Sequence, residues 1–348
     1  MLQCLPYTND MQARWDHFAA LHGGVFYTTA FRRILMEAFG YQCPYHAMVD
    51  EAGQLRALLP LAVGYNLGFK KVGVALPFIN HLDICATDAE AQQAGLRALF
   101  ALKEKYRLAY IELRLKEQPV LAETPCRLFR QHYTFELPLI GSEEAVLALS
   151  TGNNRNHIRK VYKNDWFSVS FDVGNLPAFY RVYKRRMHEL GSPSMSFHFF
   201  ELFFQYLPQA AHLLTVLDKK TEQVVGGMLL LASQDDSTLY YPYGANLVEY
   251  NHQYLNNFMY WEAVCFGRRQ GLRRLDLGRS QAGSGTYRYK AQWGATPKPL
   301  TYLTYDGGAR TSSPPDKEKL HVLIELWKMT PRVVTDWIGP RMIRYLMP

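Results

Sequence analysis

The sequence predicts an α/β protein of the α+β kind, with two lobes whose sheets are mixed and largely antiparallel. Helix-like and strand-like segments alternate through the first part of the chain, and the same order restarts near residue 142. In addition, 348 residues that are 48% hydrophobic and 20% charged can bury more than one core. We therefore expect lobes at residues 1–138 and 139–308, followed by a linker and tail at 309–348.

The first lobe is expected to begin with two amphipathic helices and to continue into short strands. An Asp50-Glu51-Ala52-Gly53 turn separates two of these strands. Asp88 is expected to cap a long helix, because its side-chain oxygen can accept from free backbone N–H groups. Periodicity gives helices at residues 11–21, 29–39 and 88–106, and strands at 45–49, 55–63, 108–114 and 133–137.

The second lobe repeats the alternation with longer strands. Its segments form antiparallel hairpins rather than a series of βαβ units. The expected helices are 142–162, 176–190, 197–206, 254–270 and 286–292, and the expected strands are 168–172, 212–217, 224–232, 238–242, 272–277 and 300–305.

The tail follows a Thr-Ser-Ser-Pro-Pro-Asp linker at residues 311–316. Beyond it, apolar residues alternate with Lys328, Arg332, Arg341 and Arg344, as in basic amphipathic helices. Such helices either lie on an anionic membrane surface or dock on the body of the protein, and both possibilities stay open here.

Composition limits the setting and the partners. The longest apolar run, residues 226–232, is too short to span a bilayer, and the N-terminus lacks the pattern of a secretory signal. The five cysteines have no metal-ligand spacing, so we expect reduced thiols, no metal and a cytoplasmic protein. A net charge of +8 indicates a polyanionic partner without identifying it.

A basic segment is the densest charge feature of the chain. Arg155, Arg159 and Lys163 share one helical face, Lys160 lies beside them, and apolar residues occupy the opposite side. A solvated surface and a cationic stripe that binds phosphate or carboxylate both fit this pattern.

A second candidate site follows the strand expected at 272–277. Gly278, Arg279 and Ser280 end this strand, and the glycine-rich turn 281–285 leads into a helix whose first N–H groups could bind an anion. Ligand sites in such sheets lie beyond strand ends.

Several segments in both lobes carry a family resemblance. They are Ala38-Phe39-Gly40-Tyr41, Ile111-Glu112-Leu113-Arg114, Arg155-Asn156-His157-Ile158-Arg159-Lys160, His188-Glu189-Leu190-Gly191-Ser192-Pro193, and the stretch from Asp276 through Tyr289-Lys290-Ala291-Gln292-Trp293-Gly294. With these segments the chain resembles the FemAB-type aminoacyltransferases and their relatives with a BioF2-like acetyltransferase domain, particularly those that accompany exosortase and exopolysaccharide loci.

The resemblance implies two tandem GNAT-like lobes, with the acceptor seated largely on the first. Such enzymes transfer an acyl or aminoacyl group from a thioester or a charged tRNA to an amine. The lysine of the family's aromatic-Lys-x-x-aromatic-Gly motif falls on Lys290, beside Tyr289. There an ammonium would stabilise the oxyanion that forms when the amine attacks the carbonyl.

Further residues are assigned with the same resemblance in view. Arg279 and Ser280 would supply a cation and a hydroxyl to the catalytic cleft, or cap the turn. Tyr243 shares a strand face with Tyr241, and the two would line the donor channel or pack in the core. Glu112 and Arg114 share a strand face, where they would bind the acceptor's carboxylate or phosphate or pair with each other.

We therefore expect a transferase that forms an amide in cell-envelope or exopolysaccharide metabolism. Its acceptor would be a small or lipid-linked envelope precursor, and it would bind no cofactor and no DNA. The co-substrate stays open between aminoacyl-tRNA and acyl-CoA or acyl carrier protein, since neither a clear pyrophosphate loop nor a coiled-coil arm is present. One alternative is an N-acyltransferase that acts on a sugar amine or amino acid, and another is a non-catalytic RNA- or membrane-binding scaffold.

Overall fold

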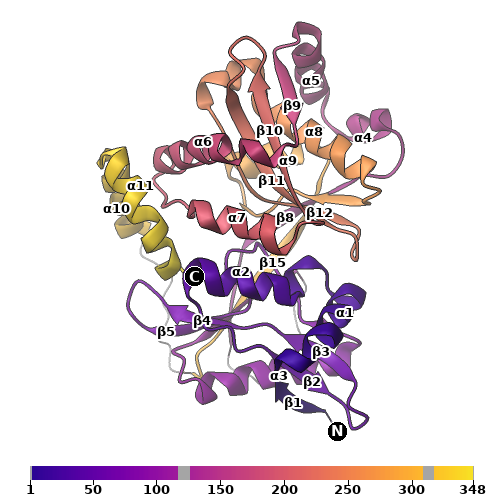
Figure 1. The fold of residues 1–348 in the computed structure, drawn as a ribbon, viewed down its shortest axis with the longest axis vertical. Coiled ribbons are helices and arrows are strands. Elements are labelled where there is room, and N and C mark those ends of the chain that lie inside the picture. The colour runs from indigo at the N-terminus through magenta and orange to yellow at the C-terminus, as the bar shows by residue number, and fades with distance from the viewer. Residues whose placement is uncertain (1, 117–125, 309–316, 348) are drawn as a thin grey trace. The chain divides into compact units, whose positions relative to one another are not determined.

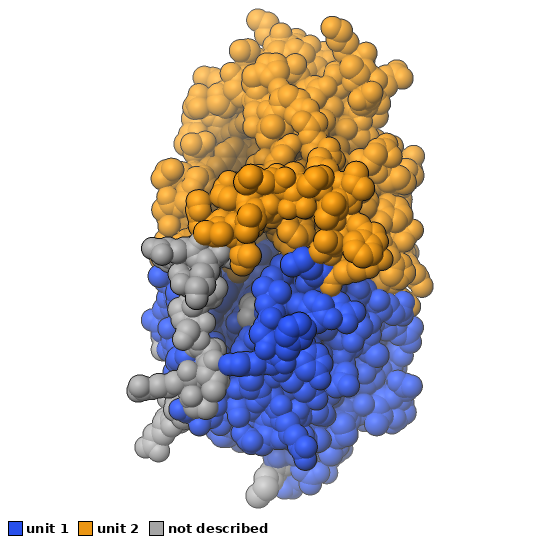
Figure 2. Space-filling model, turned by 90° about the vertical axis from the view of Figure 1, so that its left-hand side faces the viewer, with its two compact units in different colours: residues 1–132, 299–315, 342–348 blue, residues 133–298, 316–341 orange. Residues whose placement is uncertain are grey.

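The computed structural model of the protein describes residues 2–116, 126–308 and 317–347 (Figure 1). The chain forms two compact units, coloured separately in Figure 2. Unit 1 comprises residues 1–132, 299–315 and 342–348, and unit 2 comprises 133–298 and 316–341. The mixed α/β architecture predicted from the sequence is confirmed, whereas the limits of the units differ from the expected ones. The linker expected at residues 311–316 lies outside the residues that the structure describes.

Unit 1 contains two sheets and three main helices. One sheet has the order β1-β2-β3-β6, and the strands of the second follow the order β4-β5-β7-β15. The bounds are α1 (Gln12–His22), α2 (Thr29–Phe39), α3 (Ala89–Lys105), β1 (Gln3–Pro6), β2 (His46–Val49), β3 (Leu55–Leu59), β4 (Ala62–Tyr65), β5 (Lys71–Val74), β6 (Cys85–Ala86), β7 (Ile111–Leu115) and β15 (Thr296–Tyr305, of which residues 299–305 belong to unit 1).

Pairing between β7 and β15 explains why the boundary differs from the expected one. Residues 301–305 of β15 pair antiparallel with residues 111–115 of β7. Leu303 is fully buried in the same core as Ile111 and Leu113. The strand that we expected to close the second lobe therefore completes unit 1.

The single strand expected at residues 55–63 is wrong, because Pro60 separates β3 from β4 and the two belong to different sheets. Proline has no N–H to donate to a strand ladder, and its ring restricts the backbone.

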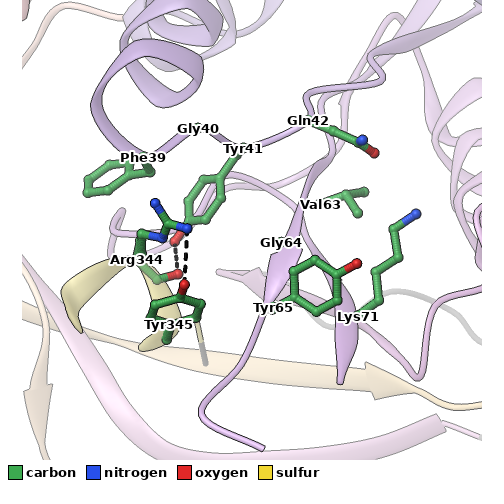
Figure 3. A pocket seen from close by; sticks show the side chains of 10 residues that line it. All are labelled: Phe39, Gly40, Tyr41, Gln42, Val63, Gly64, Tyr65, Lys71, Arg344 and Tyr345. Carbon is green, nitrogen blue, oxygen red and sulfur yellow. Dashed lines mark hydrogen bonds between the residues drawn. The ribbon is translucent and has the colours of Figure 1, made fainter. Parts of the chain in front are cut away.

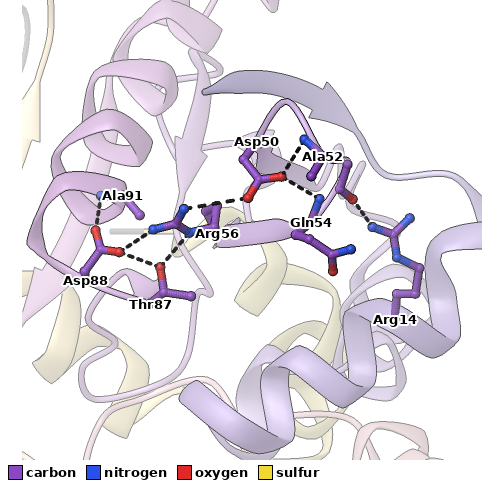
Figure 4. Close-up of polar contacts among 9 residues, drawn as sticks. Arg14, Asp50, Ala52, Gln54, Arg56, Thr87, Asp88 and Ala91 are labelled. Atoms are coloured by element: carbon purple, nitrogen blue, oxygen red, sulfur yellow. Dashed lines mark hydrogen bonds and ion pairs between the residues drawn. The ribbon is translucent and has the colours of Figure 1, made fainter. Parts of the chain in front are cut away.

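The predicted turn at Asp50 and the predicted cap at Asp88 are both confirmed, and Arg56 joins them (Figure 4). Asp50 Oδ1 accepts from the backbone N–H of Gln54 at 2.8 Å, and Asp88 Oδ1 accepts from that of Ala91 at 2.8 Å. Arg56 lies 2.6 Å from Asp88 and 3.7 Å from Asp50. The backbone bond from Ala91 and bonds from Thr87 and Arg56 lower the pKa of Asp88 to about 2.

Unit 2 holds a six-stranded arrangement in the order β8-β13-β12-β11-β10-β9. Every pair in it is antiparallel except β12 with β13. The bounds are β8 (Cys126–Pro138, of which residues 133–138 belong to unit 2), α4 (Glu143–Leu149), α5 (Gly152–Asn164), β9 (Phe167–Ser170), α6 (Leu176–Glu189), α7 (Phe197–Tyr206), β10 (Ala211–Asp218), β11 (Val224–Ser233), β12 (Thr238–Asn246), α8 (Leu255–Arg269), β13 (Arg274–Asp276), β14 (Ser280–Gln281), α9 (Gly285–Ala291), α10 (Lys317–Met329) and α11 (Arg332–Met342).

Helices cover both faces of this sheet (Figure 1). Two adjacent glycines of β11 identify the faces: a side chain at Gly227 would meet Phe179 of α6, and one at Gly226 would meet Met259 of α8. Since neighbouring strand residues point to opposite faces, α6 and α8 lie on opposite sides of the sheet. Helix α8 is buried almost throughout its length.

The helix expected at residues 142–162 is wrong as a single element. It is divided into α4 and α5 at Ser150, which is extended, and Thr151, whose hydroxyl caps α5 by accepting from the N–H of Asn154 at 3.3 Å. A threonine that accepts from the backbone favours a helix start over a helix interior.

The tail helices α10 and α11 pack on the rest of unit 2. The imidazole of His188 lies 2.9 Å from the carbonyl of Thr330, and Lys184 forms a 2.8 Å ion pair with Asp336. In the described part of the chain, no helix combines the length and the apolar character needed to cross a bilayer. All five cysteines are free thiols, as expected.

Candidate active site

The parallel strands β12 and β13 define the location of the site. They are joined through α8 and pair over only three residues each, 238–240 with 274–276. Beyond Tyr240, β12 continues to Asn246 while paired with β11 alone among the described residues. Ligand sites in α/β sheets lie beyond the carboxyl ends of parallel strands, and here that position is occupied by the segment after β13.

Lys290 reaches this strand end from α9. Its Nζ donates to the carbonyl oxygen of Gly278 at 2.8 Å and to that of Arg279 at 3.0 Å. A lysine ammonium has three N–H donors, so one remains after these two bonds. The side chain is 7% exposed, and the remaining donor is therefore held in a largely dry environment.

Burial also changes the acidity of Lys290. Removal from water lowers its pKa to about 8; Asp276 opposes the shift and Arg279 adds to it. The group is thus close to the point at which it exchanges a proton near neutral pH, as is typical of catalytic lysines.

Asp276 and Ser280 complete the strand end. Asp276 is buried and accepts from Thr134 Oγ1 and from the backbone N–H of Gly278, both at 2.7 Å. Ser280 is also buried, yet its hydroxyl forms no hydrogen bond with any residue that the structure describes. A buried hydroxyl without a partner costs about 1–3 kcal/mol, which points to a ligand at this position. Arg279 between them is exposed.

The glycine-rich turn leads into α9, as expected. Its start, however, is already capped, because Ser284 Oγ accepts from the N–H of Tyr287 at 3.1 Å. Helix α9 is only seven residues long. The structure therefore gives the expected anion site at this helix start no support, and what α9 contributes is Lys290.

Aromatic side chains pack around Tyr260, and one of them, Tyr289, directly precedes Lys290 in α9. Tyr260 of α8 contacts Tyr241 at 5.5 Å and Tyr289 at 5.4 Å between ring centroids, and stacks on Trp293 at 5.6 Å. Burial raises the pKa of the Tyr289 phenol. Tyr260 was not among the expected site residues, although it lies within a predicted helix.

The expectation that Tyr241 and Tyr243 share a strand face is wrong. The register between β11 and β12 shifts here, because Leu229 pairs with Tyr243 while Leu231 pairs with Tyr240. This irregularity turns Tyr241 toward α8, whereas Tyr243 packs edge-on against Phe199 and Phe200 of α7. A bulge changes the side-chain alternation on which the expectation rested.

The basic residues of α5 fall into two groups. Arg155 donates to the carbonyl oxygens of Ala148 and Ser150 and so ties the end of α4 to α5. Arg159 and Lys160 are exposed, and Lys160 Nζ lies 5.4 Å from the ring centroid of Tyr254. Lys163 is exposed as well, so Arg159, Lys160 and Lys163 are open to a polyanion.

Glu112 and Arg114 pair with each other in unit 1. Arg114 Nε donates to Glu112 Oε1 at 2.9 Å, and its Nη1 donates to the carbonyl oxygen of Ile79 at 3.0 Å. The guanidinium also lies 5.1 Å from the ring centroid of Tyr302. Both residues are 8% exposed, so the arrangement is a buried, satisfied ion pair.

A cavity in unit 1 was not expected from the sequence (Figure 3). It has a volume of about 160 Å³. Lys71 and Arg344 supply its cations, and no acidic residue is part of its wall, which is formed by Phe39, Gly40, Tyr41, Gln42, Val63, Gly64, Tyr65, Lys71, Arg344 and Tyr345. Tyr41 Oη donates to the carbonyl oxygen of Arg344 at 2.6 Å, which fixes the end of the chain there. In the sequence, only the segment Phe39-Gly40-Tyr41, which carried part of the family resemblance, pointed to this part of unit 1.

Comparisons with known proteins agree with this geometry. Residues 153–291 match the Acetyltransferase (GNAT) domain family. This match includes Lys290, α8 and the β12–β13 pair, and it favours an enzyme over a non-catalytic scaffold. No curated protein matches the chain by sequence.

Three solved structures share the fold over nearly the whole chain. FemX is similar with a TM-score of 0.64 and 15% identity, over 93% of this chain and 100% of FemX. L-PGS from Bacillus licheniformis has a TM-score of 0.57 and 13% identity, over 95% and 97% of the two chains. A tandem GNAT protein from the clavulanic acid biosynthesis pathway has a TM-score of 0.55 and 11% identity, over 91% and 100%.

These comparisons confirm the resemblance that the sequence motifs predicted. The low identities to solved structures establish the fold, and the domain match covers the part of the chain that holds Lys290. Residues 153–291 therefore form a GNAT-type acetyltransferase domain in a chain whose fold is similar to that of FemX and of a tandem GNAT protein, and the protein is an acyltransferase.

Proposed function

We propose that the protein transfers an activated acyl or aminoacyl group to an acceptor amine by direct attack, with Lys290 as the catalytic residue. The observation that carries this proposal is the buried Lys290, whose Nζ is bonded to two carbonyl oxygens and keeps one donor unused. As the new C–N bond forms, negative charge develops on the carbonyl oxygen, and the third N–H of the ammonium can bind it. The bond to the leaving sulfur or oxygen then breaks, and the proton that the amine loses is taken up by this sulfur or oxygen, which leaves as a thiol or hydroxyl.

Ser280 and the tyrosines have supporting roles in the proposal. The unpartnered hydroxyl of Ser280 would bind the substrate beside Lys290. Tyr289 and Tyr260 would keep water away from the reacting carbonyl, and a dry environment strengthens the interaction between ammonium and oxyanion. Arg279, exposed at the mouth of the strand end, would contact a charged part of either substrate.

For the donor we propose an aminoacyl-tRNA, with acyl-CoA or acyl carrier protein as the alternative. The exposed pair Arg159 and Lys160 supports a polyanionic donor, since phosphates are bound by clustered cations. The end of the β12–β13 pairing at Tyr240 and Asp276 favours the alternative, because the amides of a pantetheine arm could approach the backbone of β12 where β13 leaves it.

For the acceptor we propose an anionic precursor of the cell envelope or an exopolysaccharide, either free or lipid-linked, met at the cytoplasmic side of the membrane. The cavity in unit 1 supports this choice, because Lys71 and Arg344 face it without an acidic neighbour in its wall. The phenol of Tyr65 could also donate to a phosphate or carboxylate oxygen, whereas that of Tyr41 already donates to the carbonyl of Arg344. Glu112 and Arg114 are less suited to bind an acceptor, because each already satisfies the other.

The test measures transfer from a radiolabelled pool of aminoacyl-tRNAs, and separately from labelled acyl-CoAs, into envelope-precursor extract. The full-length protein is compared with Lys290→Ala and with the exposed control Lys298→Ala. Transfer that is lost only in Lys290→Ala would support the proposal, and the labelled pool that transfers would identify the donor. Unimpaired transfer by Lys290→Ala would remove Lys290 from the mechanism.

A separate experiment addresses the cavity. Lys71→Gln and Arg344→Gln are expected to raise KM for the acceptor while kcat changes little, since they remove binding that is equal in the ground and transition states. Lys220→Gln, an exposed lysine in a turn of unit 2, serves as the control. An unchanged KM in both cavity variants would place the acceptor elsewhere.

A further inference from the structure

Helices α10 and α11 pack with one side on the rest of unit 2, and their other side points away from it. Ile324 of α10 packs against Gly191, where an added Cβ would lie 2.6 Å from Ile324 Cγ2. In α11, Thr335 and Gly339 are buried, one helical turn apart, and Gly339 lies against Ser194. Positions two residues away from these contacts point in roughly the opposite direction, because each residue turns the helix by about 100°.

Those outward positions are apolar. Val322 and Leu326 are placed two residues on either side of Ile324, and Val333 and Trp337 on either side of Thr335. The outward side is exposed throughout, and its residues are Val322 at 57%, Leu323 at 58%, Leu326 at 56%, Met329 at 80%, Val333 at 83% and Trp337 at 62%. We call these six residues the tail apolar face. A group of this size on one exposed surface is typical of an interaction site.

Cations accompany the tail apolar face, and its acidic residues are already neutralised. Residues 321–347 contain Lys328, Arg332, Arg341 and Arg344 but only two acids. Glu325 pairs with Lys328 at 2.8 Å, and Asp336 pairs with Lys184 at 2.8 Å. Arg332 and Arg341 are exposed and have no carboxylate partner among the described residues. Arg341 also stacks over Trp337 at 4.4 Å, an aromatic–cation pair suited to the boundary between lipid and water.

We propose that the tail apolar face docks on the surface of an anionic lipid bilayer, with the apolar side chains at acyl-chain depth and Arg332 and Arg341 at the level of the phosphates. Charge complementarity selects this occupant. A symmetric contact with a second copy of the chain would bring the same arginines together, whereas anionic headgroups neutralise them. Docking through α10 and α11 does not depend on which donor or acceptor the transferase uses.

The experiment is co-sedimentation of the full-length protein with vesicles of phosphatidylcholine alone or with 30% phosphatidylglycerol, at low and high salt. A variant with Met329→Ser, Val333→Ser and Trp337→Ser is compared with a control that carries Leu21→Ser, Ile140→Ser and Val173→Ser, which are exposed apolar residues elsewhere. We expect the tail variant to lose about tenfold or more in affinity for the anionic vesicles and the control to bind like the unmodified protein. Arg332→Gln with Arg341→Gln should weaken binding by about tenfold and reduce its salt dependence.

Two results would overturn the proposal. One is equal vesicle binding, or none, by the unmodified protein and the tail variant. The other is a concentration-dependent dimer in sedimentation velocity that the tail variant abolishes, which would make a second copy the occupant. Transfer to a soluble acceptor, measured in parallel, is expected to stay unchanged in the tail variant, so failure of the docking proposal and failure of the proposed reaction are distinguishable.

Discussion

Two buried cations of this protein are held in contrasting ways. In unit 1, Arg114 pairs with Glu112 at 2.9 Å and also donates to a backbone carbonyl. In unit 2, Lys290 donates to two neutral carbonyl oxygens. Asp276, whose charge acts on Lys290, accepts from Thr134 and from a backbone N–H. The charge of Arg114 is neutralised by Glu112, so this pair stabilises the fold. Among the described residues, Lys290 is hydrogen-bonded only to neutral carbonyl oxygens, so its positive charge stays available for a ligand.

The largest effect on stability is expected when Arg114 is replaced. Arg114→Met should lower the free energy of unfolding by about 3–5 kcal/mol, because it leaves Glu112 charged, buried and unpaired. Urea denaturation measures the loss. The double variant Glu112→Leu/Arg114→Met should recover most of it, and a double variant as unstable as the single one would show that the pair does not act as a unit.

At Lys290 the large effect should be on rate. Lys290→Met is expected to lower kcat about 10²- to 10³-fold, the usual cost of removing one oxyanion donor, while the protein stays folded by circular dichroism. Lys298→Met is the matched control, since Lys298 is exposed. A variant that lost activity only because it unfolded would instead lose substrate binding and secondary structure together.

The proposed role of Lys290 also predicts how kcat and stability change with pH. Because the ammonium is the proposed active form and burial sets the pKa of Lys290 at about 8, kcat should fall about tenfold per pH unit above pH 8. Between about pH 8 and the unfolded value of 10.5, the unfolded chain holds more protons at this lysine than the folded protein does. The contribution of Lys290 to stability therefore rises with pH in that range. A rate that increased through pH 8 would assign the neutral amine as a base.

Ser280 offers a smaller test beside Lys290. Ser280→Ala should lower kcat/KM about tenfold if the hydroxyl binds substrate, and it should leave stability unchanged or slightly raised, because a buried unsatisfied group disappears. Thr134→Val is the counterpart, since its hydroxyl is bonded to Asp276. It should lower stability by about 1–3 kcal/mol, and equal effects of the two variants on stability would contradict the difference.

The smallest effect is expected on the surface of α5. Arg159→Gln with Lys160→Gln should weaken binding of a polyanionic donor and reduce the slope of log K against log salt by about 1.5 to 2. Filter binding of tRNA at several salt concentrations measures this slope. Lys219→Gln with Lys220→Gln controls for net charge, and an equal reduction by the control would leave no special role for α5.

Local signals predicted most helices well, while long-range features were missed. Helices α2 and α7 begin and end where periodicity predicted, and in the structure Thr28 and Ser196 cap them. The division at Ser150 was missed because an amphipathic pattern continues across it. The pairing of β15 with β7 depends on contacts nearly two hundred residues apart, which no local pattern contains.

For the candidate site, too, local motifs were predicted from the sequence and long-range contacts were not. Lys290 was predicted through a motif, but its two carbonyl acceptors and its burial follow from how α9 packs on the strand end. The face of Tyr243 was predicted wrongly because a bulge is a tertiary feature. The cavity at Lys71 and Arg344 joins residues from distant parts of the sequence, so charge patterning alone could not identify it.

The return of the chain to unit 1 affects when the protein can mature. On a ribosome, β7 emerges long before residues 301–305 of β15, its antiparallel partner, and Tyr41 emerges long before Arg344, whose carbonyl oxygen accepts its hydrogen bond. Unit 1 is therefore begun first, but it is complete only after most of unit 2 has been made. Until residues 301–305 emerge, the edge of β7 that pairs with them is open to mispairing, and chaperones that protect such edges can act on the chain at this stage.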